Sequence, residues 1–148
     1  MSHQQAATAW PEPTSRFIEV DGVKLHYLDW GGRPGKRTFL LLHGGAAHVH
    51  WWDAVAPLLV PHGRVIALDF RGHGRSAWAN PPHYGPQWYL HDVRGVESTL
   101  VRAGQARRMH RKIRHSTFKE IPRAFHHVSL DNPAGTAEAI VEFVESAL

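Results

Sequence analysis

Alternating and continuous apolar runs predict the strands in the first half of the chain. Residues 17–29 form two strand-like runs around Asp21-Gly22, a dipeptide typical of a tight hairpin turn, and the run that starts at Val23 alternates apolar with polar positions. Residues 38–42 and 65–68 are almost wholly apolar, which is typical of strands buried on both faces of a parallel sheet. The pattern therefore predicts an antiparallel hairpin followed by two buried strands.

Apolar residues at helical spacing predict three helices. The first covers residues 51–59, where Pro57 limits its regularity, and the second covers residues 87–102. The third begins with Asn132 as N-cap and Pro133 in its first position. The predicted inner faces are Trp52, Val55, Ala56 and Leu59 in the first helix, Tyr89, Val93, Val96, Leu100 and Val101 in the second, and Ala137, Ile140, Val141 and Val144 in the third.

Strands that alternate with helices predict an α/β fold with a parallel sheet, to which residues 113–121 add a weak strand. The chain has 148 residues, 43% of them hydrophobic and 20% charged, which fits one globular domain. The absence of cysteine excludes disulfides, thiolate metal sites and a cysteine nucleophile. Residues 1–13 do not resemble a signal peptide, and no apolar run reaches the roughly 18–20 residues that span a bilayer. We expect a cytoplasmic protein with no membrane partner.

The formal charge of +4 comes from one segment. Six basic residues lie in a stretch without acids, and removing them from the 17 basic residues leaves 11 against 13 acids, a net charge of −2. Such a segment can contact phosphates or an acidic surface, but no nucleic-acid-binding fold pattern accompanies it. We therefore favour a solvated connector and expect no nucleic-acid partner. The six residues are Arg102, Arg107, Arg108, Arg111, Lys112 and Arg114.

Glycines that directly follow the first buried strand form a candidate oxyanion site. His43-Gly44-Gly45 allows a sharp turn that brings backbone N–H groups close to a ligand, although such a turn can also serve chain reversal alone. His48 and His50 lie nearby and suggest a metal site, but no carboxylate stands at a ligand spacing. We expect neither a metal nor a cofactor.

Two further motifs are more specific. Asp69-Phe-Arg71-Gly-His-Gly-Arg-Ser76 follows the second buried strand, and the tail contains His126-His127-Val-Ser-Leu-Asp-Asn-Pro. With the glycine turn, they resemble the α/β-hydrolase family, over roughly residues 16–104 and 116–148. The resemblance implies a three-layer, mostly parallel α/β sheet with an N-terminal antiparallel hairpin, and hydrolysis of an ester or related bond. It also implies that His43, Gly44 and Gly45 form the oxyanion and substrate site, and that His126 is the catalytic general base.

The resemblance also implies that the middle of the family's chain is missing. The family places a nucleophile elbow, a lid and an acid between residues 104 and 116, and the sequence has no Gly-x-Ser-x-Gly turn. Leu90-His91-Asp92 superficially matches an aspartate elbow, but helical periodicity continues through it, so we assign no nucleophile. The resemblance divides residues 1–148 into a flexible N-terminus (1–15), an N-terminal half (16–104), a basic junction (105–115) and a C-terminal strand and helix (116–148).

A missing nucleophile strand would leave residues 38–42 at an open sheet edge. Either residues 113–121 dock there, which would bring His126 to the oxyanion turn, or a second copy of the chain covers the edge. Three functions follow: an impaired hydrolase of a small-molecule substrate, a non-catalytic remnant that binds a small ligand, and a phosphate-binding role for residues 107–114.

Overall fold

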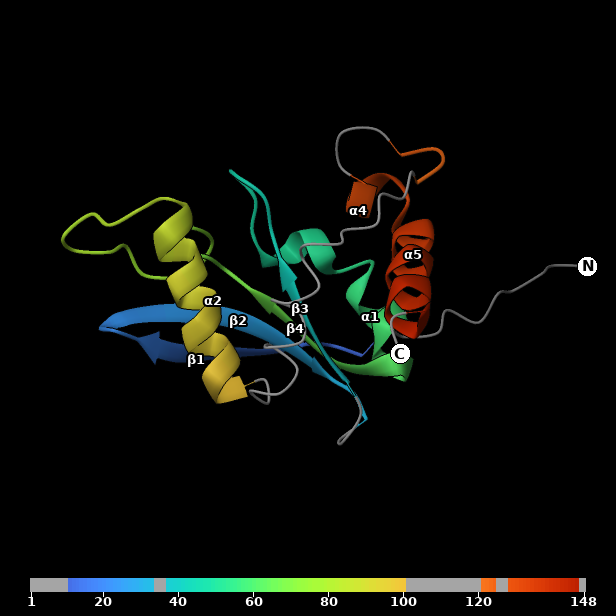
Figure 1. Cartoon of the computed structure of the whole chain (residues 1–148), viewed down its shortest axis with the longest axis horizontal. Coiled ribbons are helices and arrows are strands. Elements are labelled where there is room, and N and C mark those ends of the chain that lie inside the picture. The colour runs from blue at the N-terminus through green and yellow to red at the C-terminus, as the bar shows by residue number, and fades with distance from the viewer. Residues whose placement is uncertain (1–10, 34–36, 101–120, 125–127, 147–148) are drawn as a thin grey trace, which may run out of the picture.

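The computed structural model describes residues 11–33, 37–100, 121–124 and 128–146 of the chain. Its strands are β1 (Thr14–Val20), β2 (Val23–Gly31), β3 (Arg37–Leu42) and β4 (Gly63–Leu68), and they form one sheet in the order β1-β2-β4-β3 (Figure 1). The helices are η1 (Val49–Trp52), α1 (Ala56–Leu59), η2 (Val60–His62), α2 (Pro86–Leu100), α4 (Val128–Asp131) and α5 (Pro133–Ser146).

The sheet is mixed. β1 pairs antiparallel with β2, β2 pairs antiparallel with β4, and only β3 and β4 are parallel among the described strands. The hairpin prediction is confirmed, since Asp21 and Gly22 take φ values of 45° and 75° at the turn between β1 and β2. A turn with positive φ at both central positions matches the twist of the strands that it joins. β1 begins at Thr14, so residues 14 and 15 of the expected N-terminal segment lie in a strand.

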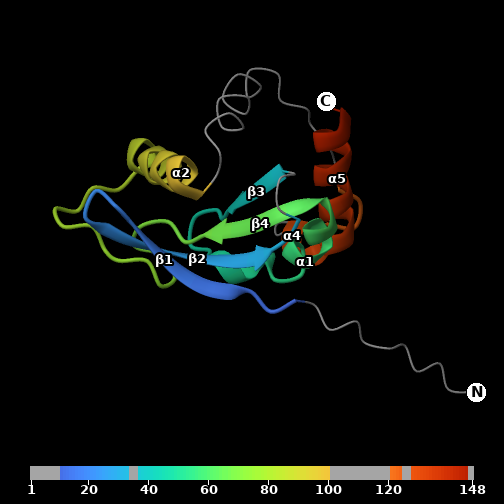
Figure 2. The same cartoon turned by 90° about the horizontal axis from the view of Figure 1, so that it is seen from below.

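Helices cover both faces of the sheet, which gives three layers (Figure 2). One face buries Val65 and Ala67 of β4 against α1 and α5, and the other buries Ile66 and Leu68 against α2 and the loop before it. Successive side chains of a strand point to opposite faces, so the apolar run at residues 65–68 of β4 is what a strand between two helical layers requires.

α5 confirms the last helix prediction. The side chain of Asn132 accepts a hydrogen bond from the N–H of Gly135 at 3.0 Å, and Pro133 opens the helix. The Asn132 side chain thus satisfies one of the free N–H groups at the helix start, and Pro133 has no N–H that needs a partner. The predicted inner face packs on the core of α1 and the sheet, with Ala137, Ile140, Val141 and Val144 in contact with it.

The predicted helix over residues 51–59 is wrong. The structure instead has η1, a turn and the single-turn helix α1. Pro57 explains the break, because proline has no N–H for the helical ladder and is tolerated in a first turn, where α1 places it. The loop between residues 127 and 133 also contains the short helix α4, which the sequence pattern did not predict.

β3 has a partner strand on one side only among the described residues. It pairs with β4, and its outer edge carries no described strand. Most of residues 113–121 lie outside the described residues, and Ile121 is not in a strand, so docking of this segment stays a prediction. The basic junction also lies outside them. No described helix has the length and apolar character needed to cross a membrane.

Substitution of Leu59 tests how much the packing of α1 on the sheet stabilises the fold. Its side chain is completely buried in the cluster beneath the sheet, so Leu59→Ala should lower the free energy of unfolding by about 2–5 kcal/mol, as lost burial and a cavity together predict. The exposed Leu90 of α2 provides the control, and Leu90→Ala should change this free energy by less than about 0.5 kcal/mol. Urea unfolding of the three proteins measures both values, and equal losses would contradict the assignment.

Candidate active site

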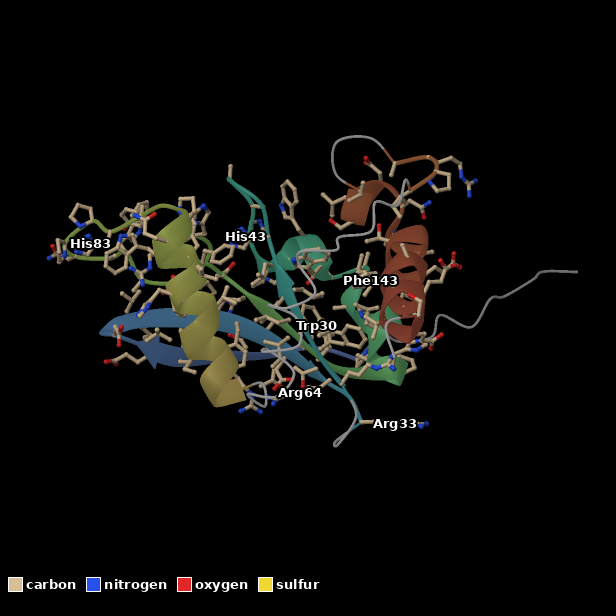
Figure 3. All side chains as sticks on the ribbon, in the orientation of Figure 1. Trp30, Arg33, His43, Arg64, His83 and Phe143 are labelled. Carbon is tan, nitrogen blue, oxygen red and sulfur yellow. The ribbon has the colours of Figure 1, made fainter. Side chains whose placement is uncertain are left out.

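The candidate site lies where β3 and β4 end. His43 follows β3 directly and Asp69 follows β4, and parallel neighbours bring their carboxyl ends to the same edge of the sheet. Figure 3 shows His43 at this end of the sheet, well away from His83 in the loop before α2. The structure therefore brings together the two motifs that the sequence singled out in its first half.

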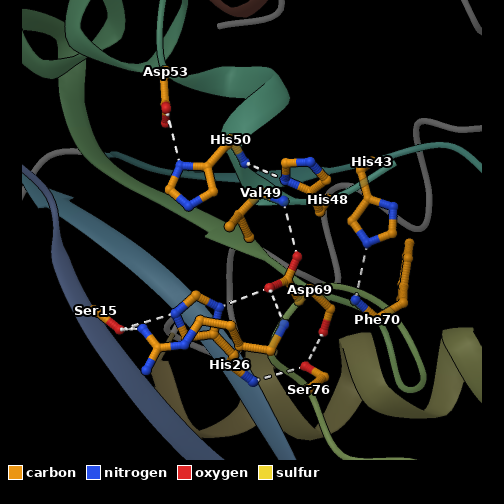
Figure 4. Close-up of polar contacts among 11 residues, drawn as sticks. Ser15, His26, His43, His48, Val49, His50, Asp53, Asp69, Phe70 and Ser76 are labelled. Atoms are coloured by element: carbon orange, nitrogen blue, oxygen red, sulfur yellow. Dashed lines mark hydrogen bonds and ion pairs between the residues drawn. The ribbon is translucent and has the colours of Figure 1, made fainter. Parts of the chain in front are cut away.

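His43 fastens the two loops to each other. Its Nδ1 lies 2.7 Å from the carbonyl oxygen of Gly44, and its Nε2 lies 3.1 Å from the backbone nitrogen of Phe70 (Figure 4). The Phe70 N–H must donate, so Nε2 accepts, and Nδ1–H donates to the Gly44 carbonyl. Both ring nitrogens are thus engaged within the chain, and His43 links the loop after β3 to the loop after β4.

Burial keeps the imidazole of His43 neutral. Its side chain is almost wholly enclosed, and this desolvation is the largest cause that lowers the pKa of His43. The nearby His73 and His48 lower the pKa further, while the hydrogen bond to Gly44 and the charge of Asp69 oppose the shift. A neutral ring is the form that can accept the Phe70 N–H.

Gly44 and Gly45 leave open space at the end of β3. Both residues are exposed, neither has a positive φ, and a Cβ atom on either would meet no atom within 4 Å. Neither the backbone conformation nor the packing of the described residues therefore demands glycine at these positions. Glycine is needed where a ligand must approach the backbone closely, because it has no side chain in the way.

The carboxylate of Asp69 is the centre of the site. It is completely buried and accepts three hydrogen bonds: Val49 N–H to Oδ1 at 2.8 Å, and His26 Nδ1 and Arg75 N–H to Oδ2 at 2.7 and 3.1 Å (Figure 4). One side chain thus joins β2, the loop after β3 and the loop after β4. Gly74 approaches this carboxylate so closely that a Cβ would lie 2.2 Å from Oδ2, and its φ is +51°, so glycine is required there.

Ser76 holds the same loop to β2. Its hydroxyl donates to the carbonyl of Asp69 at 2.6 Å and accepts the N–H of His26 at 2.8 Å. Ala77 N–H donates to the carbonyl of Lys24 at 2.8 Å, so the loop stays hydrogen-bonded to β2 beyond the end of β4. Ser76 is buried and fully used in these contacts, which agrees with its not being a nucleophile.

A buried ion pair fixes α2, and the sequence did not predict it. Arg71 donates from Nε and Nη2 to the two carboxylate oxygens of Asp92 at 2.7 and 2.5 Å, and both side chains are enclosed. This hydrogen-bonded contact raises the pKa of Arg71. Trp88 packs beneath the guanidinium, with 5.4 Å from Cζ to the ring centroid. Asp92 lies inside α2, which confirms that residues 90–92 are helical and not an elbow.

The other histidines that the sequence singled out are those of the C-terminal segment and of the loop after Gly45. His126 and His127 lie outside the described residues, so the place of the predicted general base stays a prediction. His48 Nδ1 accepts the N–H of His50 at 3.4 Å, and the His50 ring pairs with Asp53 at 2.9 Å. Within the described ranges, no three histidine or carboxylate side chains converge as a metal site would require.

Comparison with known proteins supports one family. The sequence model described as the alpha/beta hydrolase fold matches residues 37–94, which include both strand ends and the Arg71–Asp92 pair. An esterase of Mycobacterium tuberculosis is 35% identical over 85 residues, and a non-heme haloperoxidase of Rhodococcus erythropolis is 45% identical over 65 residues. The solved structure of the Cif epoxide hydrolase of Acinetobacter nosocomialis superposes with a TM-score of 0.57 at 26% identity.

These matches support membership of the α/β-hydrolase fold family. The matched regions cover 57% of this chain and 26% of the esterase, 43% of this chain and 22% of the haloperoxidase, and 62% of this chain and 28% of the epoxide hydrolase. The chain thus spans about a quarter of the length of these relatives. The part that the family model matches runs from β3 into α2 and includes the loops after β3 and β4.

The neutral state of His43 makes the stability of this protein depend on pH. Because folding lowers the pKa of His43, the unfolded chain binds this proton more tightly, and stability rises with pH across the window below about 6.5. The contribution is present above that pH and is lost as the pH falls through the lowered value. Urea unfolding at pH 7.5 and 5.5 should show a smaller difference for His43→Gln than for the wild type. Equal differences would contradict this role, since the other histidines are common to both proteins.

The Arg71–Asp92 pair supplies a second test. Asp92→Asn leaves the buried Arg71 charge without its partner, which should lower the free energy of unfolding by about 3–5 kcal/mol. Asp53→Asn removes an exposed carboxylate that also has a basic partner, and should cost at most ~0.5 kcal/mol. Comparison of the two urea midpoints measures the difference, and similar midpoints would show that the buried pair adds little.

Proposed function

We propose that this α/β-hydrolase acts on esters of small carboxylic acids at the ends of β3 and β4. The observation that carries the proposal is the open turn of Gly44 and Gly45, where no described side chain fills the space beside the backbone. Backbone N–H groups in such a turn can stabilise the oxyanion of a tetrahedral intermediate. The similar protein of Mycobacterium tuberculosis is an esterase, which agrees with the proposed reaction class.

The neighbouring residues support this role by holding the turn in place. His43 ties Gly44 to Phe70, and Asp69 holds Val49 at the other end of the same loop. Both anchors are buried, so the loop does not need to reorganise when charge develops on a bound substrate. In this proposal His43 acts through the loop and does not contact the substrate.

His126 supplies the general base in the proposed reaction. Its assignment rests on the resemblance of residues 126–133 to the family's histidine segment, with α5 following as the family order requires. A histidine and an oxyanion turn without a nucleophile can activate water directly, so we expect slow turnover without a covalent intermediate.

A second candidate is a binding module for small ligands that performs no chemistry. The sequence favours it in one respect, since it contains no Gly-x-Ser-x-Gly turn. Such a module would use the same open turn to hold a carbonyl or carboxylate group.

Hydrolysis of 4-nitrophenyl acetate separates the two candidates. The wild type should release nitrophenolate above the buffer rate, and His126→Ala should reduce that rate by about 100-fold or more, as loss of a general base predicts. His127→Ala is the matched control, because it removes an adjacent histidine that the resemblance does not assign to the site. Rates for the wild type and His126→Ala that both equal the buffer rate would favour the binding module.

A further inference from the structure

Asp69 of the candidate site is also the end of a row of three side chains connected by hydrogen bonds. The hydroxyl of Ser15 lies 3.0 Å from Nε2 of His26, and Nδ1 of His26 lies 2.7 Å from Oδ2 of Asp69 (Figure 4). Ser15 is exposed near the start of β1, whereas His26 and Asp69 are buried. The order of atoms is that of a Ser-His-Asp triad, which is recognised by geometry and roles rather than by sequence position.

We propose that Ser15, His26 and Asp69 form a second, nucleophilic site that accepts acyl groups from small anionic aryl esters. Ser15 is the nucleophile, His26 is the base, and Asp69 orients the imidazole. The site goes beyond the function proposed above, because it uses neither the glycine turn nor His126. The family's own triad follows the order nucleophile, acid, histidine, so these three residues are not its counterpart.

The surrounding hydrogen bonds place the protons of His26 and Ser15 where nucleophilic attack requires them. The ionised Asp69 can only accept, so His26 carries its proton on Nδ1 and presents a lone pair on Nε2. The Ser15 hydroxyl then donates to Nε2. The enclosure of His26 and Asp69 prevents water from competing for these bonds, and the backbone of His26 is held at both ends by Ser76 and Asp69.

The same surface carries a positive charge beside the nucleophile. Nη1 of Arg75 donates to the Ser15 hydroxyl oxygen at 2.9 Å, where it can also meet the oxyanion of a tetrahedral intermediate. The partly exposed ring of Phe17 lies next to His26, with 5.2 Å between ring centroids. Lys24 Nζ and Arg75 Cζ lie 4.4 and 5.4 Å from the centroid of that ring. An aromatic ring flanked by two cations fits an aryl group that bears a carboxylate.

The proposed step balances in atoms and protons. Ser15 Oγ bonds to the ester carbonyl carbon while its proton passes to Nε2 of His26. The bond from that carbon to the aryloxy oxygen then breaks, and His26 returns the proton to the leaving phenol. Water, activated by His26, later attacks the acyl-Ser15 ester and releases the carboxylic acid with Ser15 restored.

Covalent labelling of the full chain tests the nucleophile. Diisopropyl fluorophosphate should place one diisopropylphosphoryl group on Ser15 with loss of fluoride, located by mass spectrometry of the peptides. Ser15→Ala should lose this adduct, while Ser146→Ala, which removes an exposed serine of α5, should keep it. Circular dichroism and urea unfolding establish that both variants are folded.

Absence of the adduct from Ser15 in the folded wild type would overturn the proposal, and the three residues would then only anchor β1. Labelling of the urea-unfolded wild type at Ser15 to the same extent would also overturn it, because an unfolded chain has no triad. The result is independent of the function proposed above, which depends on turnover that His126→Ala removes and not on an adduct at Ser15.

Two matched esters test the substrate class. Acetylation of Ser15 by 4-acetoxybenzoate should be about two- to fivefold faster than by the neutral 4-acetoxybenzamide, as attraction to exposed cations predicts. Lys24→Gln should reduce this preference, and 0.5 M salt should weaken it because exposed charges are screened. Equal rates for the two esters in the wild type would overturn the assignment of anionic substrates.

Discussion

The buried carboxylate of Asp69 is the interaction on which the rest of this structure depends. An ionised group without water is costly unless hydrogen bonds compensate it, and Asp69 receives one from each of three segments. Those segments are β2, the loop after β3 and the loop after β4. The requirement to satisfy one charge therefore fixes the relative positions of the loops that form the candidate site.

A second charged contact extends this arrangement to the helical layer. Arg71 stands two residues after Asp69 and reaches into α2, where Asp92 meets it with both oxygens. The loop after β4 is thus held to the sheet at one residue and to α2 at another. His43 adds a neutral link from β3, so polar bonds rather than apolar packing determine how this end of the sheet is closed.

The two proposed sites share Asp69 but differ in what they require. Oδ1 holds Val49 in the loop of the glycine turn, while Oδ2 holds His26 beneath Ser15. A polar anchor that a fold needs for stability can thus also orient a base, because the same hydrogen bond that satisfies a carboxylate fixes the tautomer of a histidine. Stability and chemistry are coupled at this residue.

The sequence alone determined those features that depend on neighbours along the chain. The Asp21-Gly22 turn, the two buried strands, the Asn132 cap and the glycine turn after β3 were predictable because local backbone preference and burial period produce them. The break near Pro57 was also a local effect, although the sequence pattern predicted a continuous helix there.

Only the tertiary structure decided which polar residues meet. Ser15, His26 and Asp69 come from three separate elements, and Asp92 lies 21 residues from Arg71. Helical periodicity placed Asp92 in α2 but did not reveal its partner, because the energy that buries a charge comes from contacts that exist only after the chain has folded.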